Sequence, residues 1–174
     1  MKILFLHGLE GSPRGSKAQW LRDAGHHVMA PELDTSAVCA HLAGETASAA
    51  LPCEAWGSPL GSARQGLAGV DVVVGSSFGG GLALLLAQQG LWRGPLVLLA
   101  PAGRKLFGID SVEVSRLAIL HGRRDDVVPL ADSLALAEHA CAEVTLRVVD
   151  DDHRLAASVA AGVLGELLAI VGRP

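Results

Sequence analysis

The stretch Val72-Val73-Val74-Gly75-Ser76-Ser77-Phe78-Gly79-Gly80-Gly81 decides the fold of this chain. Three β-branched residues run directly into Gly-x-Ser-x-Gly, and an Ala/Leu-rich run from Leu82 to Gln89 follows without a break. The pattern predicts a strand, a sharp turn and a helix, with Ser77 at the apex of the turn. Gly75 and Gly79 flank the serine at positions where such a turn leaves no room for side chains. A strained turn of this kind would hold the Ser77 hydroxyl above the sheet, at the N-terminus of a helix.

A glycine-rich turn between a strand and a helix can also bind a phosphate group. However, Gly-x-Gly-x-x-Gly is absent from this chain, and no Gly-Lys-Ser/Thr follows the turn. The next predicted strand, 96–100, ends in Pro101-Ala102-Gly103, without the acidic residue that would bind a ribose. We therefore interpret the turn as the carrier of a serine nucleophile rather than as a nucleotide site.

Length and composition predict one globular domain that covers residues 1–174. Half of the 174 residues are hydrophobic, and 14 Lys and Arg against 18 Asp and Glu give a formal net charge of −4. Because no run of basic residues is present, nucleic acid is not expected as a partner. No apolar stretch has the length of a membrane span or of a signal peptide, so we expect no membrane association.

The three cysteines, Cys39, Cys53 and Cys141, form neither a disulfide framework nor a zinc-binding pattern. We interpret them as buried free thiols of a protein in a reducing cytoplasm. No set of His, Asp and Glu residues has metal-ligand spacing, so the sequence predicts no metal and no other cofactor.

Strands and helices alternate along the chain. Strands are predicted over 2–6, 27–30, 70–74, 96–100, 116–120 and 144–149, and helices over 16–24, part of 34–50, 78–89, 130–142 and 154–171. The segments 51–61 and 103–115 are predicted to be a loop and an irregular connection. Several strands are continuously apolar, which favours a parallel sheet covered on both faces. The expected fold class is therefore α/β, a three-layer α/β/α sandwich with a mainly parallel sheet of about six strands.

Functional groups of open parallel sheets gather at the carboxyl ends of the strands. Ser77 follows the third predicted strand, Asp125 and Asp126 follow the fifth, and His153 follows the sixth. A serine, an acid and a histidine thus occur in this order, each at a strand end. Serine hydrolases use this set, because a base must take the hydroxyl proton before the serine can attack. Asp150, Asp151 and Asp152 form either a solvated acidic turn or a set of charges that favours the charged form of His153.

On these residues the chain resembles the α/β-hydrolase superfamily over nearly its whole length, because Ser, Asp, His is the order of that superfamily. The segment His-Gly-x-x-Asp-x-x-Val-Pro at 121–129 is similar to the acid-bearing loop of many of its esterases. On that match Asp125 is the triad acid, and Asp126 is the alternative. The opening Phe-Leu-His-Gly-Leu-Glu-Gly-Ser-Pro at 5–13, with Lys17 soon after, resembles small lidless bacterial serine esterases. The first two strands of the usual eight are missing.

The expected activity is that of a serine carboxylesterase or acyl-thioesterase with an acyl-enzyme intermediate on Ser77. His153 would act as the base, Asp125 would orient it, and the backbone N–H groups of Leu9 and Phe78 would form the oxyanion hole. His7 and His121 are interpreted as structural residues that shape the oxyanion loop and the acid loop.

The connection over 101–115 is too short to form a separate lid domain. Leu106, Phe107 and Ile109 either line an acyl site or pack against the sheet, and the segment with Trp56 offers another wall. Such an open site favours short acyl esters or thioesters over long lipids. A non-catalytic binding or interaction protein that retains the fold is the alternative. The chain would be a monomer, or a homodimer that forms through an exposed edge strand.

Overall fold

The structure is a computed structural model of the chain and describes residues 1–43 and 53–173. One six-stranded sheet has the order β2-β1-β3-β4-β5-β6, and every neighbouring pair of strands is parallel. The strands are β1 (Lys2–Leu6), β2 (His27–Met29), β3 (Val72–Ser76), β4 (Leu96–Leu99), β5 (Glu113–Gly122) and β6 (Cys141–Val149). The prediction of an α/β fold with about six mainly parallel strands is confirmed.

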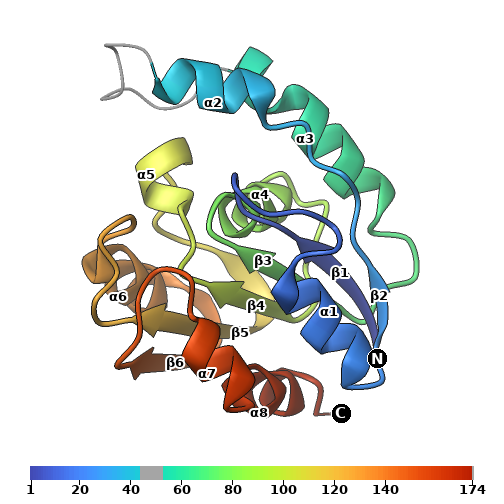
Figure 1. The fold of residues 1–174 in the computed structure, drawn as a ribbon, viewed down its shortest axis with the longest axis vertical. Coiled ribbons are helices and arrows are strands. Elements are labelled where there is room, and N and C mark those ends of the chain that lie inside the picture. Colours follow the sequence, from blue (N-terminus) through green and yellow to red (C-terminus); the bar gives the residue numbers. More distant parts are fainter. Residues whose placement is uncertain (44–52, 174) are drawn as a thin grey trace.

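Helices cover both faces of the sheet, which gives three layers (Figure 1). One face carries α1, α7 and α8, and the other carries α3, α4, α5 and α6. In the described part of the chain the helices are α1 (Ser16–Asp23), α2 (Ser36–Leu42), α3 (Cys53–Gln65), α4 (Phe78–Gln88), α5 (Gly103–Phe107), α6 (Leu130–His139), α7 (Ala156–Ala160) and α8 (Val163–Val171).

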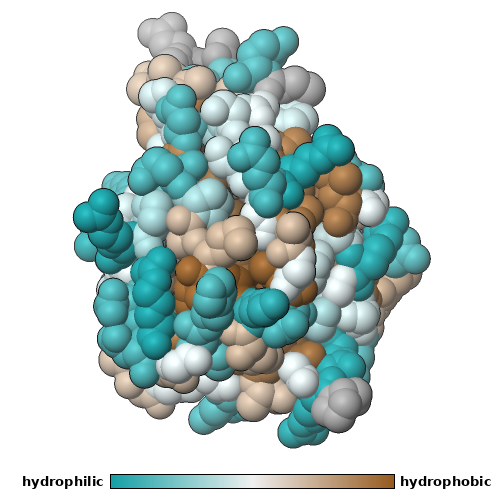
Figure 2. All heavy atoms as spheres, turned by 90° about the vertical axis from the view of Figure 1, so that its right-hand side faces the viewer, coloured by the Kyte–Doolittle hydropathy of each residue, from teal (hydrophilic) through white to brown (hydrophobic). Residues whose placement is uncertain are grey.

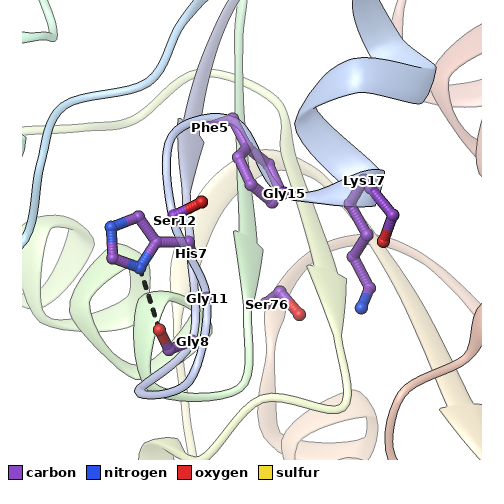
Figure 3. A pocket seen from close by; sticks show the side chains of 9 residues that line it. Phe5, His7, Gly8, Gly11, Ser12, Gly15, Lys17 and Ser76 are labelled. Carbon is purple, nitrogen blue, oxygen red and sulfur yellow. Dashed lines mark hydrogen bonds between the residues drawn. The ribbon is translucent and has the colours of Figure 1, made fainter.

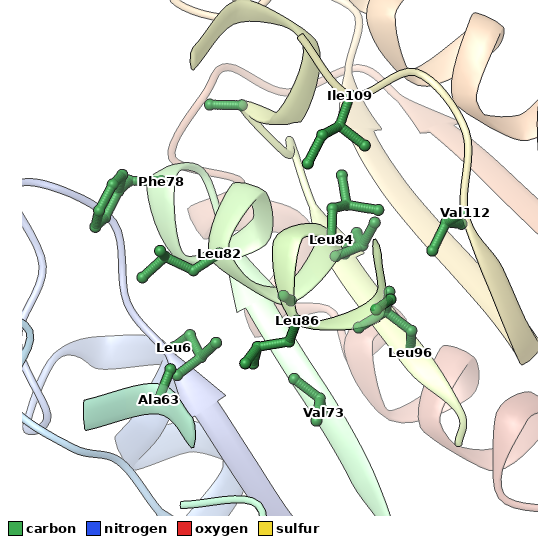
Figure 4. Packing of buried hydrophobic residues seen from close by; sticks show 14 of the residues in the cluster. Leu6, Ala63, Val73, Phe78, Leu82, Leu84, Leu86, Leu96, Ile109 and Val112 are labelled. Atoms are coloured by element: carbon green, nitrogen blue, oxygen red, sulfur yellow. The ribbon is translucent and has the colours of Figure 1, made fainter. Parts of the chain in front are cut away.

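Each face of the sheet has its own apolar core, because successive strand side chains point to opposite faces. Phe5 and Val74 pack toward α1 and α8, whereas Leu6 and Val73 pack toward α4. Figure 4 shows α4 enclosed by apolar side chains from the strands and from the neighbouring helices. A helix that is apolar all round is buried on all sides, and each fully buried Leu contributes about 1.5–3 kcal/mol. This burial fixes α4, and with it the turn that carries Ser77.

The prediction of a loop over 51–61 is wrong for the described residues, because α3 begins at Cys53 and ends at Gln65. Residues 51 and 52 lie outside the described residues. Ala55, Pro59 and Ala63 are buried at a spacing of four residues, and Ala55 and Ala63 belong to the core around α4. Tertiary packing of this stripe stabilises a helix that the Pro and Gly content disfavours. Trp56 therefore lies on a helix and not in a loop.

Three other predicted elements differ from the structure. The helix predicted over 154–171 is two helices, α7 and α8, because Gly162 lies between them with a φ of 88°. The connection over 103–115 contains α5 and the first residues of β5. Within 34–50 the helix α2 is short, and residues 44–50 lie outside the described residues.

The cysteines differ from expectation as well. Cys39 on α2 and Cys141 at the start of β6 are free but exposed, so the prediction of buried thiols is wrong for both. Within 1–43 and 53–173, no group of three or more His, Cys, Asp or Glu side chains is arranged to hold a metal ion.

The two edge strands of the sheet are β2 and β6. β2 has only three residues, and short edge strands are poor templates for pairing with another chain. Figure 2 shows the side of the molecule that lies at the right of Figure 1, with hydrophilic side chains over most of it and apolar areas between them. None of the described helices is long and apolar enough to cross a membrane.

Candidate active site

Ser77 lies at the apex of the turn between β3 and α4, with φ 54° and ψ −117°. A non-glycine residue rarely adopts a positive φ, so the turn is strained as its sequence predicts. A Cβ atom at Gly75 would lie 2.6 Å from the Gly79 carbonyl oxygen, and one at Gly79 would lie 2.1 Å from the Leu6 carbonyl oxygen. Both glycines are therefore required by close backbone packing, which presses the turn against the end of β1.

We expect Gly79→Ala to destabilise the protein by about 3 kcal/mol or more, because the added methyl group meets backbone atoms that cannot move aside. Gly61→Ala is the matched control, since a Cβ atom there meets nothing within 4 Å. In the exposed face of α3 that change should stabilise the protein by about 0.5–1 kcal/mol. Urea denaturation measures the free energy of unfolding of both variants. Wild-type stability of Gly79→Ala would contradict the close packing of the turn.

A chain of hydrogen bonds joins Ser77, His153 and Asp125. His153 Nε2 lies 2.9 Å from Ser77 Oγ, and His153 Nδ1 lies 2.7 Å from Asp125 Oδ2. The His153 side chain is 18% exposed and that of Asp125 is 1% exposed. The three residues follow β3, β6 and β5, so the parallel sheet brings together groups that are far apart in the sequence. In this arrangement the imidazole can take the serine proton while the carboxylate faces the resulting positive charge.

The loop after β5 holds the Asp125 carboxylate in place. Oδ1 accepts the N–H groups of Val127 and Val128 at 2.9 and 2.8 Å. Burial raises the pKa of Asp125, but the hydrogen bonds from Val128, His153 and Val127 outweigh it and keep the pKa below its ordinary value. Asp126 is exposed. The structure thus brings Asp125, and not Asp126, to His153.

His121 lies buried beneath the same loop. Its Nε2 is 3.0 Å from the Val128 carbonyl oxygen and 3.3 Å from Asp125 Oδ2, and its Nδ1 is 2.7 Å from Ser133 Oγ. Since both neighbours of Nε2 are acceptors, Nε2 carries the proton and the Ser133 hydroxyl donates to Nδ1. Burial lowers the pKa of His121 and outweighs the hydrogen bond to the Val128 carbonyl and the nearby Asp125 carboxylate, both of which raise it. The predicted bracing of the acid loop by His121 is confirmed by these contacts.

We expect the free energy of unfolding to fall as the pH drops below about 6.5, where histidine in the unfolded chain takes up a proton. Because the pKa of folded His121 is lower, the unfolded state binds more protons in this range and is favoured. One such group contributes at most about 1.4 kcal/mol per pH unit. Asp125, whose folded pKa is also lowered, adds a further loss below about pH 4.

Urea midpoints measured across this pH range for wild type and His121→Gln test that expectation. The stability of the variant should depend less on pH near the acidic end, whereas His27→Gln, at an exposed histidine, should keep the wild-type dependence. An unchanged dependence in His121→Gln would assign the effect to another group.

The loop after β1 is fixed by the buried His7. The Leu33 N–H donates to His7 Nε2 at 3.3 Å, so Nδ1 carries the proton and donates to the Gly8 carbonyl oxygen at 2.8 Å. A Cβ atom at Gly8 would lie 3.2 Å from Ser77 Cβ, which places this loop directly against the serine. His7 therefore has a structural position in the loop that precedes Leu9.

The two predicted oxyanion donors are the backbone N–H groups of Leu9 and Phe78, which directly follow Gly8 and Ser77 in the chain. Across the described residues, neither the N–H of Leu9 nor that of Phe78 donates a hydrogen bond. Phe78 opens α4, where the first N–H groups of a helix have no partner within it. Both groups are free to meet a developing negative charge, and their catalytic role remains a prediction.

Three aromatic rings lie in a row beside the turn. The Phe78 and Phe107 ring centroids are 6.1 Å apart, and Trp56 meets Phe107 edge-on at 6.2 Å with an interplanar angle of 78°. Phe78 is fully buried, whereas Trp56 and Phe107 are partly exposed. Leu106 and Ile109 are each 5% exposed and lie in the core around α4. Of the predicted substrate residues, the structure brings Trp56 and Phe107 together near the turn and places Leu106 in the core.

Sequence reasoning missed the position of Asp151, which is 6% exposed rather than solvated. Its Oδ2 accepts the N–H and the hydroxyl of Ser158, each at 2.8 Å, and its Oδ1 accepts the Asp152 N–H at 2.9 Å. Burial raises the pKa of Asp151, but these hydrogen bonds outweigh it and lower the pKa. Asp151 thereby ties the loop of His153 to α7. A spacing of seven residues matches no local capping pattern, so the sequence carried no signal for this contact.

No protein-family model matches the sequence, and no curated protein matches it either. Solved structures match nearly the whole chain. A protein of the alpha/beta superfamily of hydrolases from Xanthomonas campestris pv. campestris is 23% identical, with a TM-score of 0.66 and 97% of each chain covered. Est1E from Butyrivibrio proteoclasticus with bound ferulic acid is 15% identical, with a TM-score of 0.65 over 97% of this chain and 89% of that one. A structure from the metagenome-derived lipolytic enzymes LipS and LipT is 17% identical, with a TM-score of 0.67 over 98% and 92%. At these identities the matches show a shared fold.

Proposed function

Because the chain has the α/β-hydrolase fold, we propose that it is a serine hydrolase that cleaves small carboxylic esters or thioesters. The observation that carries this proposal is the hydrogen-bond chain from Ser77 Oγ through His153 to Asp125, with distances of 2.9 and 2.7 Å. In the proposed reaction His153 takes the Ser77 proton while Oγ attacks the carbonyl carbon. Asp125 holds the imidazole and stabilises its charged form.

The proposed oxyanion hole is formed by the N–H groups of Leu9 and Phe78, which meet the negative charge on the former carbonyl oxygen. His153 then gives its proton to the leaving alcohol or thiol, and an acyl-enzyme on Ser77 remains. The same histidine activates water for the second half of the reaction, which releases the carboxylic acid and restores the serine.

We further propose that residues 1–174 act as one domain without a lid domain, and that the site prefers short acyl groups. α5 has only five residues, which limits the wall that the connection after β4 adds to the site. Phe107 and Trp56 would contact the acyl group, with Leu106 supporting them from the core. The likeness to the lipolytic enzymes and to Est1E with its bound ferulic acid supports an ester as the substrate.

A fluorophosphonate probe tests the proposed nucleophile, and mass spectrometry locates its adduct. We expect one adduct on Ser77 and hydrolysis of p-nitrophenyl esters that declines from short acyl chains to palmitate. Faster turnover of long chains would contradict the proposed short-acyl preference. An unmodified Ser77 together with no hydrolysis of any ester would instead favour a non-catalytic binding protein that retains the fold.

A further inference from the structure

A cavity of about 80 Å³ lies beside the turn of Ser77, on the face of the sheet that carries α1. Its walls come from Gly8 and Ser12 of the loop after β1, from Lys17 in the first turn of α1, and from Ser76 of β3. Figure 3 shows the side chains of Lys17 and Ser76 among those that line this pocket, one from α1 and the other from β3. A cavity of this volume holds a group of a few heavy atoms rather than a long acyl chain.

Three side chains of this pocket, those of Lys17, Ser76 and Ser12, have donor groups that meet no acceptor in the part of the chain that the structure describes. Within 1–43 and 53–173, the Lys17 ammonium makes no hydrogen bond, and no carboxylate lies within 4.0 Å of it. The Ser76 side chain belongs to a buried residue, and its hydroxyl makes no hydrogen bond to another described residue. Ser12 Oγ accepts the Arg14 N–H at 3.3 Å, which leaves its own proton free to donate. A lysine and two hydroxyls thus present donors to one small space.

The charged neighbours of Lys17 are Asp151, Asp152 and Arg154. Burial lowers the pKa of Lys17, and the two carboxylates raise it from a distance. Both carboxylates are occupied locally: Asp151 binds Ser158 and the Asp152 N–H, and Asp152 Oδ1 accepts the Arg154 N–H at 2.8 Å. They balance part of the lysine charge without filling the pocket or satisfying its donors.

The pocket is adjacent to the reacting atoms. Ser76 directly precedes Ser77, and a Cβ atom at Gly8 would lie 3.8 Å from Ser77 Oγ. The pocket wall thus includes both the residue that precedes Ser77 in the chain and the glycine that packs against its side chain. On the premise of the proposed esterase function, we infer that this pocket is a subsite for an anionic group of the ester substrate. Lys17 is its specificity-determining residue.

The inference names a substrate class. The ester carries a carboxylate or a phosphate a few bonds from the scissile carbonyl, in its acyl part or in its alcohol part. Hydrogen bonds between charged groups are stronger than those between neutral ones, and the lysine supplies such a bond in a partly desolvated space. The aromatic pair of Trp56 and Phe107 and this cationic pocket would then receive different parts of one substrate.

Matched esters test the inference. For a carboxylate in the acyl part, monoethyl glutarate is compared with ethyl pentanoate. For a carboxylate in the alcohol part, 4-acetoxybutanoate is compared with butyl acetate. For a phosphate, 3-acetoxypropyl phosphate is compared with propyl acetate. We expect kcat/KM of wild type to favour at least one anionic ester over its neutral partner. In Lys17→Met that preference should fall by about ten- to a hundredfold, the range of one charge-assisted hydrogen bond. Lys17→Arg should retain part of it.

Lys2→Met is the charge-matched control, because Lys2 begins β1 at the opposite end of the strand from the turn of Ser77. It should keep the wild-type preference. The inference is overturned if wild type hydrolyses the neutral esters with no preference for any anionic one, or if Lys17→Met leaves the preference intact. Hydrolysis of neutral esters in the same preparation shows that the proposed function still stands in that case. Absence of all hydrolysis and of Ser77 labelling overturns both.

Discussion

Ser77→Ala should reduce kcat for a short p-nitrophenyl ester by about 10⁴-fold or more, since it removes the only protein atom in the proposed mechanism that bonds to the substrate carbon. The remaining rate would come from the oxyanion donors and from substrate binding. Adding His153→Ala to this variant should cause little further loss, because the base has no function without the hydroxyl. Steady-state kinetics of the two single variants and of the double variant measure this non-additivity.

The same substitution should leave the fold intact. The Ser77 side chain makes no capping hydrogen bond to α4, and alanine must adopt the same φ of 54° that serine already adopts. We therefore expect the free energy of unfolding to change by less than about 0.5 kcal/mol. Ser115→Ala is the control, because Ser115 is exposed near the start of β5, far along the strand from the site. Activity in Ser77→Ala above about a hundredth of wild type would rule out Ser77 as the nucleophile.

Asp125→Asn should lower kcat by about 10⁴-fold, because an amide favours the wrong tautomer of the histidine and cannot stabilise its charged form. The Asn side-chain oxygen can still accept the N–H groups of Val127 and Val128, so the loop should keep its shape. The large effect should therefore arise in the chemistry and not in the folding of the loop.

Asp126→Asn is the matched comparison, since it removes the same charge one residue along the same loop. Asp126 is exposed, and its replacement should change kcat by less than about twofold, as is usual for surface positions away from the reacting groups. Kinetics and urea denaturation of the two variants, measured side by side, separate catalysis from stability. A large loss in Asp126→Asn with an active Asp125→Asn would reverse the assignment of the acid.

The parts of the fold that the sequence predicts well are those with a local physical cause. The sequence has three β-branched residues before Gly75 and an apolar run after Ser77. This local pattern predicts a strand, a turn and a helix. Continuous apolar strands require cover on both faces, which explains why the three layers could be predicted. The positions of Ser77, Asp125 and His153 at strand ends follow from the same elements.

Predictions failed where distant contacts override local preference. Pro59 and the neighbouring glycines favour a loop, but the buried stripe of Ala55, Pro59 and Ala63 lies in a helix. Asp151 belongs to an acidic run, which is typical of a solvated turn. In the structure its carboxylate is buried and hydrogen-bonded to Ser158. In both cases the deciding contact belongs to no recognised local sequence pattern.

By itself, the sequence determined the α/β class, the strained turn at Ser77 and the order of a serine, an acid and a histidine along the chain, since backbone sterics and hydrophobic periodicity act over a few residues. Only the tertiary structure decided that Asp125 rather than Asp126 meets His153, at 2.7 Å, because the buried His121 and the N–H groups of Val127 and Val128 fix the loop register. It also decided that Lys17 and Ser76 share one pocket, because α1 packs against the face of the sheet to which the Ser76 side chain of β3 points.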